Sequence, residues 1–157
     1  MNIFYLHNDP AICAQLHNDK HVVKMIVETA QILSTAHFNN GSHQPWMYKP
    51  THKHHPCTVW AGSSTANYQW AWELGMELCK EYTYRYGKRH KTQDKLELLR
   101  TAPPVVNEYW TPPPQCMPEQ YHRDNYVDGY REYYRAEKAG FSRWTKRPIP
   151  DFMADVI

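Results

Sequence analysis

Four polar residues near the start of the chain recur at a spacing that suits chemistry. His17, His21, Lys24 and Glu28 stand at positions i, i+4, i+7 and i+11, which places them along one face of an α-helix. An amine and a carboxylate one helical turn apart can act as nucleophile and general acid or base, and imidazoles beside them position substrates. We therefore interpret this polar stripe as the candidate active site, with His21, Lys24 and Glu28 as catalytic residues.

A solvated helix face is the alternative interpretation of the polar stripe, with Lys24 and Glu28 forming a surface ion pair of roughly a few tenths of a kcal/mol. A solvated face usually carries several Lys and Glu, whereas this one has two imidazoles and one residue of each charge. The rest of the helix is almost entirely apolar, so Lys24 and Glu28 need partners if they are buried. The pattern favours a cleft or a polar interior.

A second polar cluster follows at residues 49–56, which read KPTHKHHP. Its residues His52, Lys53, His54 and His55 are candidate contacts to phosphate groups, although a basic loop that happens to be rich in histidine is the simpler interpretation. The same imidazoles are candidate ligands of a metal ion together with His17 or His21. The spacing matches no standard zinc finger, so we expect neither a metal nor another cofactor.

The distribution of charge says more about partners than the total does. The net charge of +2 is weak for a nucleic-acid-binding protein, but cations gather in residues 84–91 and 131–147, where aromatic rings stand between them. Rings and cations in alternation are suited to stacking on bases while binding phosphates. The further candidate contacts to nucleic acid are His17, Arg85, Lys88, Arg89, Arg143, Trp144, Lys146 and Arg147.

The elements that must position these residues are helices. Apolar residues at helical spacing predict helices over about residues 10–37, 58–86, 94–100 and 123 or 125–139. Asp9 and Pro10 are typical of a helix start, and Gly87 of a helix end. Residues 102–118 contain six Pro and predict a non-helical crossing segment. We expect an all-α protein, with a single compact domain over residues 1–157 that has three to four helices and long Pro-rich connections.

Cysteine spacing and hydropathy exclude several classes of protein. The four Cys show no CxxC spacing, and we expect reduced thiols. No apolar run approaches the ~18 residues of a membrane span, and no signal peptide is recognisable. These features favour a cytoplasmic protein over a membrane or secreted one.

The pattern Asp19, His21 and Glu28, written D-x-H-(x6)-E, follows a short apolar opening at residues 2–6. This order resembles the phage family of pyrimidine-dimer DNA glycosylases and abasic-site lyases, also called ultraviolet-repair endonuclease V. The aromatic and basic segment with which that family ends is similar to the one that carries Tyr130, Tyr133, Tyr134, Trp144, Lys146 and Arg147. The resemblance implies a small all-helical enzyme that acts on double-stranded DNA in the cytoplasm of a phage-infected bacterial host, and a monomer is favoured.

The resemblance also implies a mechanism. In that family an amine attacks C1′ of the damaged nucleotide, a Schiff base forms, and a carboxylate, here Glu28, removes a C2′ proton so that the strand breaks. His21 is then expected to position the sugar-phosphate. The family's amine is the chain's own N-terminus, freed when Met is removed before a small residue. Here Asn2 follows Met1, so the nucleophile is either the Met1 amine or Lys24.

A second departure concerns the lesion. The family's arginines beside the catalytic Glu are replaced here by Val27 and Thr29, so the substrate is a pyrimidine dimer or another damaged or modified base. If the Met1 amine is the nucleophile, it is expected within about 8 Å of Glu28, on one cleft with Lys24 and His21.

Two other functions stay open on the sequence alone. One is a metal-assisted enzyme acting on nucleotides or modified bases through the histidine clusters. The other is a non-catalytic phage protein that binds nucleic acid through residues 131–147, with a polar stripe that is only structural.

Overall fold

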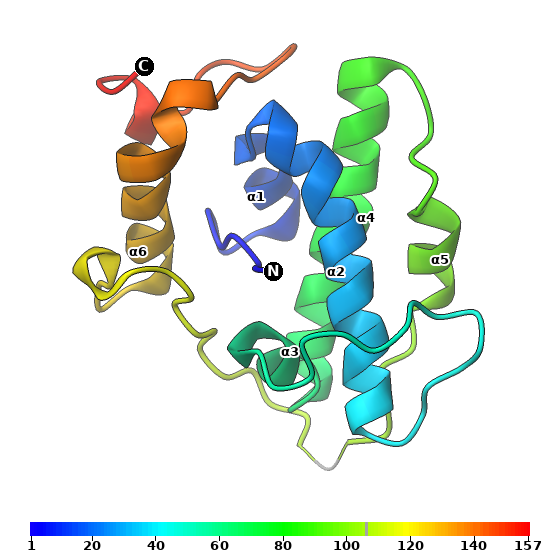
Figure 1. Cartoon of the computed structure of the whole chain (residues 1–157). Helices are drawn as coiled ribbons and strands as arrows, with labels where there is room; N and C mark the ends of the chain where they lie inside the picture. Colours follow the sequence, from blue (N-terminus) through cyan, green and yellow to red (C-terminus); the bar gives the residue numbers. More distant parts are fainter. Residues whose placement is uncertain (106) are drawn as a thin grey trace.

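The computed structural model describes residues 1–105 and 107–157, and within them the secondary structure is helical, with no strand. The α-helices are α1 (Pro10–Leu16), α2 (Asp19–Asn39), α3 (Pro56–Ala61), α4 (Thr65–Tyr86), α5 (Gln93–Leu98) and α6 (Tyr126–Tyr133) (Figure 1). The all-α prediction is confirmed. The described residues contain six α-helices, however, instead of three to four, because two of the predicted helices are each broken in two.

The first break separates α1 from α2 at His17 and Asn18. The last carbonyls of α1 are bonded by Arg85, which donates to the backbone oxygens of Gln15 and His17 at 3.0 and 2.9 Å. The Asn18 side chain caps α2 by accepting from the backbone N–H of His21 at 2.8 Å. Each helix end therefore has its own hydrogen-bond partners.

The second break separates α3 from α4. Gly62 ends α3, and the Ser64 side chain caps α4 by accepting from the backbone N–H of Asn67. The predicted helix start at Asp9 and Pro10 and the predicted helix end at Gly87 are confirmed, because Asp9 caps α1 and Gly87 ends α4 with a φ of 69°. The other bounds differ from the predicted ones by about two residues, since α2 ends at Asn39, α3 begins at Pro56 and α5 spans Gln93–Leu98. The last helix is shorter than predicted and continues as a π turn over Tyr134–Lys138.

The Pro-rich stretch 102–118 is non-helical wherever it is described, and residue 106 within it lies outside the described residues. None of the described helices is long and apolar enough to span a membrane.

The opening of the chain lies in the hydrophobic core. α2 packs against α4, which also contacts α1 and α5, and the N-terminal segment runs between α6 and the α2–α4 pair (Figure 1). Residues 3–6 are each 5% exposed or less. The Phe4 ring meets Tyr130, Tyr133 and Tyr134 from the α6 side. The apolar opening is therefore an extended core segment without regular backbone pairing.

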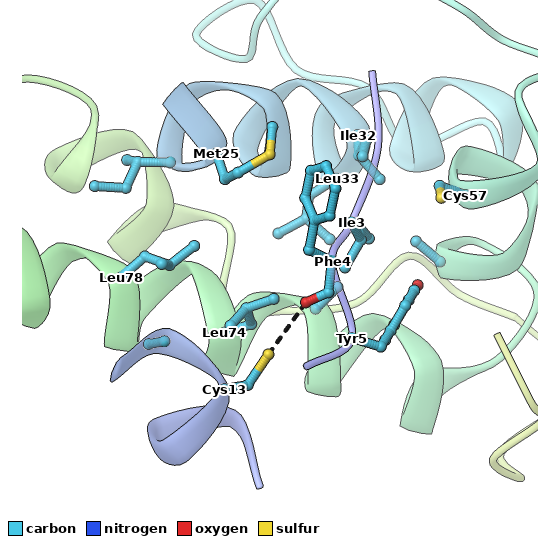
Figure 2. Packing of buried hydrophobic residues seen from close by; sticks show 14 of the residues in the cluster. Ile3, Phe4, Tyr5, Cys13, Met25, Ile32, Leu33, Cys57, Leu74 and Leu78 are labelled. Atoms are coloured by element: carbon cyan, nitrogen blue, oxygen red, sulfur yellow. Dashed lines mark hydrogen bonds between the residues drawn. The ribbon is translucent and has the colours of Figure 1, made fainter. Parts of the chain in front are cut away.

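Hydrogen bonds from two other segments hold this opening. Cys13 of α1 donates its thiol to the carbonyl oxygen of Phe4 at 3.2 Å (Figure 2). Arg131 of α6 donates to the carbonyl oxygen of Leu6 at 2.9 Å. Helices at both sides of the segment thus satisfy backbone groups that a strand partner would otherwise bind.

A buried ion network joins α2 to α4. The Arg85 side chain is fully buried and donates to Glu81 at 2.8 Å and to Asp19 at 2.9 Å. Arg147 donates to the other oxygen of Glu81 at 2.9 Å. Without Arg85, the carbonyl oxygens of Gln15 and His17 lose their side-chain donor, Glu81 keeps only Arg147, and Asp19 keeps only Thr145. Loss of these charged hydrogen bonds in a buried position is costly.

Arg85→Ala is expected to lower the free energy of unfolding by about 3 kcal/mol, since it leaves buried acceptors without a donor. Urea denaturation at pH 7 measures this. Arg89→Ala is the matched control, because Arg89 forms its ion pairs with Asp94 and Glu97 at an exposed surface, and its midpoint should stay close to that of the wild type. An Arg85→Ala protein as stable as the wild type would contradict the structural role of Arg85.

Candidate active site at the N-terminus

The Glu28 carboxylate is the centre of the candidate site. Its side chain is 12% exposed, and Oε1 lies 3.5 Å from the Met1 amine. The backbone N–H of Asn2 donates to the same oxygen at 3.2 Å. Lys24, one turn earlier on α2, brings its Nζ to 3.7 Å from Oε2, and its side chain is 71% exposed. The expected proximity of the Met1 amine to Glu28 is confirmed, and so is the Lys24–Glu28 pair.

The Met1 amine is held in place through Asn2. Asn2 Nδ2 donates to the carbonyl oxygen of Cys116 at 2.8 Å, and the Tyr130 hydroxyl donates to Asn2 Oδ1 at 3.0 Å. The Met1 side chain is itself only 4% exposed. With residues 3–6 buried behind it, the amine has little freedom to move away from Glu28.

A cleft of about 260 Å³ opens over this pair. It is lined by Met1, Asn2, Phe4, His21, Lys24, Met25, Glu28, Cys116, Tyr133 and Lys138. A larger hollow of about 480 Å³ lies between Lys80 and Gln93, so volume alone does not identify the site. The convergence of an amine, a carboxylate, an imidazole and two lysines makes this cleft the candidate site.

His21 forms one wall of the cleft. Its ring stacks on Phe4 with centroids 4.3 Å apart, and its Nδ1 lies 2.7 Å from the Tyr134 hydroxyl. Burial, followed by the positive charge of His17 and of Lys138, lowers the pKa of His21 to about 2. His21 is therefore neutral at physiological pH, and its contacts in the cleft are a hydrogen bond and ring stacking.

Several residues of the site were absent from the sequence-based prediction. Asn2, Phe4, Tyr133 and Lys138 line the cleft, and Lys138 lies 4.9 Å from the centroid of the Tyr133 ring. Lys20, one turn before Lys24, lies 4.9 Å from the Phe141 ring. The N-terminal position of Asn2 and Phe4 and the basic composition near Lys138 were visible in the sequence, but their place beside Glu28 depends on long-range packing.

Three of the predicted nucleic-acid contacts lie in the interior, which corrects the prediction. His17 is fully buried, with Nδ1 2.7 Å from the carbonyl oxygen of Cys13, and burial lowers its pKa to about 4. Because His17 caps the C-terminus of α1, it is not part of the polar stripe on α2. Arg85 belongs to the buried ion network, and Trp144 donates its Nε1 to the carbonyl oxygen of Leu16 at 2.8 Å. All three have structural partners and no surface to offer DNA in this conformation.

Arg147, another predicted nucleic-acid contact, is only partly accessible, because its half-buried guanidinium pairs with Glu81 and lies 4.3 Å from the Tyr84 ring. The other predicted contacts are more accessible. His55 is half-buried at the start of α3. The exposed ones are His52, Lys53, His54, Lys88, Arg89, Arg143 and Lys146. Their role in binding stays a prediction.

The fold and the site together define a small helical protein in which an α-amine pairs with a largely buried carboxylate at a basic, ring-lined cleft. The model of the pyrimidine dimer DNA glycosylase family matches residues 1–94, more than half of the chain, and the protein belongs to this family. A search of curated proteins and a search of solved structures gave no match. The matched region contains Met1, His21, Lys24 and Glu28.

The His21 ring is expected to remain unprotonated as the pH falls from 8 to 4, because its pKa is lowered to about 2. The unfolded chain takes up this proton near the ordinary histidine pKa of 6.5, so the folded state loses stability as the pH falls below that value. Proton NMR of the ring follows the titration, with His21→Asn used to assign the signals. A midpoint near 6.5 would contradict the buried, stacked position.

Proposed function

We propose that the protein is a DNA glycosylase and abasic-site lyase that acts on damaged pyrimidines in double-stranded DNA, with the Met1 amine as nucleophile and Glu28 as acid and base. The observation that carries the proposal is the 3.5 Å separation between the Met1 amine and Glu28 Oε1. Membership of the pyrimidine dimer DNA glycosylase family supports the substrate class.

In the proposed reaction the unprotonated amine attacks C1′, the bond from C1′ to the base breaks, and the base leaves with a proton. The sugar ring opens as the C1′–N bond becomes an imine. Glu28 then removes a proton from C2′, and the C3′–O bond breaks by β-elimination, so that the phosphate leaves. Hydrolysis of the imine by water restores the amine. The whole sequence of steps needs an amine within reach of C1′ and a carboxylate within reach of C2′ of the same sugar.

Two amines lie near Glu28, and their positions favour Met1. The Met1 side chain is 4% exposed and Asn2 is bonded to Cys116 and Tyr130, so the α-amine is held before substrate arrives. The Lys24 side chain is 71% exposed and loses rotamer freedom whenever it is fixed. An α-amine is also intrinsically less basic than a lysine amine, so a larger fraction is nucleophilic at neutral pH. We assign Lys24 to phosphate binding.

Removal of Met1 would not displace the amine from the carboxylate. The backbone nitrogen of Asn2 already lies 3.2 Å from Glu28 Oε1. Either first residue therefore presents an α-amine to the same oxygen, and the intact mass of the purified protein identifies which one carries it.

The proposed contacts to a displaced nucleotide come from the walls of the cleft. Tyr133, which is half-buried, offers a ring for a base beside the buried rings of Phe4 and His21, and Lys24 and Lys138 offer cations for the flanking phosphates. Thr29, which stands beside Glu28 where the family has an arginine, is buried against Gly75 of α4. Lesion recognition is therefore assigned to the cleft walls.

Borohydride is expected to trap a covalent adduct between the wild-type protein and duplex DNA with one abasic site, because it reduces the imine. Lys24→Ala is expected to retain adduct formation, with weaker DNA binding, since Lys24 supplies charge. Blocking the α-amine by selective acetylation is expected to abolish the adduct. Gel mobility of the labelled strand measures it. Loss of the adduct in Lys24→Ala but not in the blocked protein would transfer the role of nucleophile to Lys24.

Glu28→Gln is expected to lower strand cleavage by at least 100-fold while duplex binding changes less than threefold, since the amide keeps the shape but accepts no proton. Cleavage of duplexes carrying a thymine dimer or an abasic site, and a binding titration, measure the two effects. Glu77→Gln is the matched control, because Glu77 pairs with Lys80 on an exposed turn of α4. Full activity in Glu28→Gln would rule out the proposed role.

A further inference from the structure

Three potential metal ligands that the proposed reaction does not use meet beside Asn2. They are His55 and Cys57 at the start of α3 and Cys116 in the Pro-rich stretch. One ligand atom from each lies within 4.8 Å of the others, and the two Sγ atoms are 3.6 Å apart. The chain therefore brings two thiols and an imidazole together from positions about 60 residues apart in sequence.

The distances suit a tetrahedral thiolate site. Bond lengths of about 2.3 Å to sulfur and 2.0 Å to nitrogen separate the ligand atoms of a tetrahedral zinc ion by roughly 3.3–3.8 Å. The Sγ–Sγ distance of 3.6 Å already falls in this range. Soft thiolates with an imidazole select Zn²⁺ over hard cations such as Mg²⁺.

The backbone around the three ligands is held in place. The backbone N–H of Cys57 donates to His55 Nδ1 at 3.1 Å, so the imidazole proton is on Nε2, and a metal bound by Nδ1 takes the place of this N–H. The backbone N–H of Cys116 bonds to the Tyr130 hydroxyl at 3.0 Å. Cys57 is buried beside Ile3 (Figure 2), and its thiol lies 3.5 Å from Asn2 Oδ1. The cluster thus adjoins the residue that positions the Met1 amine.

We propose that His55, Cys57 and Cys116 bind one Zn²⁺ ion, with a solvent molecule as the fourth ligand. Each thiol releases its proton on binding, so the two negative charges of the thiolates balance the charge of the ion. The bound metal links α3, through His55 and Cys57, to the Pro-rich stretch, through Cys116, next to Asn2. Its role is to hold the N-terminal segment in place, and the proposal stands whether or not the Met1 amine is the nucleophile.

Titration of the reduced full-length protein with Co²⁺ under nitrogen tests the site. The expected spectrum has the visible bands of tetrahedral Co²⁺ and a near-ultraviolet thiolate-to-metal band, with saturation at one ion per chain and bleaching by Zn²⁺. Release of two protons per ion is the second readout. An unchanged spectrum, or the pink octahedral spectrum of unbound Co²⁺, would overturn the proposal.

Variants locate the ligands. Cys116→Ser and Cys57→Ser are expected to abolish the thiolate band, and His55→Asn to weaken Co²⁺ binding at least tenfold while an Asn oxygen keeps the cap of α3. Cys79→Ser, at a buried cysteine of α4 outside the cluster, should bind Co²⁺ as the wild type does. Bands that persist in both cluster variants would overturn the assignment. A disulfide between Cys57 and Cys116 would also overturn it. Such a disulfide is seen as an intact mass two hydrogens below that of the reduced chain, in protein that binds no Co²⁺.

Discussion

Burial of residues 3–6 in the hydrophobic core is the constraint on which the site depends. Ile3, Phe4, Tyr5 and Leu6 are each 5% exposed or less, and complete burial of a large apolar side chain contributes about 1.5–3 kcal/mol. The segment lies between α6 and the α2–α4 pair (Figure 1), so these helices pack around the chain's own beginning. Because residues 3–6 are fixed in the core, Met1 and Asn2 have little conformational freedom, and the Met1 amine stays beside α2.

The pairing of the amine with Glu28 explains how a charged carboxylate is tolerated in a nearly enclosed position. Oε1 is bound by the backbone N–H of Asn2 as well as by the amine, and Oε2 faces Lys24. A nucleophilic amine must lose its proton, and the Asn2 N–H and the charge of Lys24 still hold the Glu28 side chain in place when it does. Among the described residues Oε2 has no hydrogen-bond partner, which leaves it for proton transfer in the proposed reaction.

Local signals in the sequence predicted much of this structure, and long-range contacts account for the rest. Helical periodicity gave the all-α class and the Lys24–Glu28 pair, because both depend on residues one turn apart. The break before α2 was missed because apolar residues keep their spacing across it, while the stabilising Arg85 lies 68 residues away from His17. Arg85 was predicted to bind DNA because it lies in a basic stretch, and its buried partners are distant in sequence. The position of Asn2 could not be predicted either, because its partner Tyr130 is 128 residues away.

In the proposed reaction the α-amine, held against Glu28, is the nucleophile. Peptide mapping by mass spectrometry of a borohydride-reduced adduct, after digestion of both the protein and the DNA, names the modified nitrogen directly. The sugar remnant is expected on the α-amine of the N-terminal peptide, and the peptide that contains Lys24 is expected to be unmodified. A remnant on Lys24, with a free α-amine, would contradict the proposed reaction.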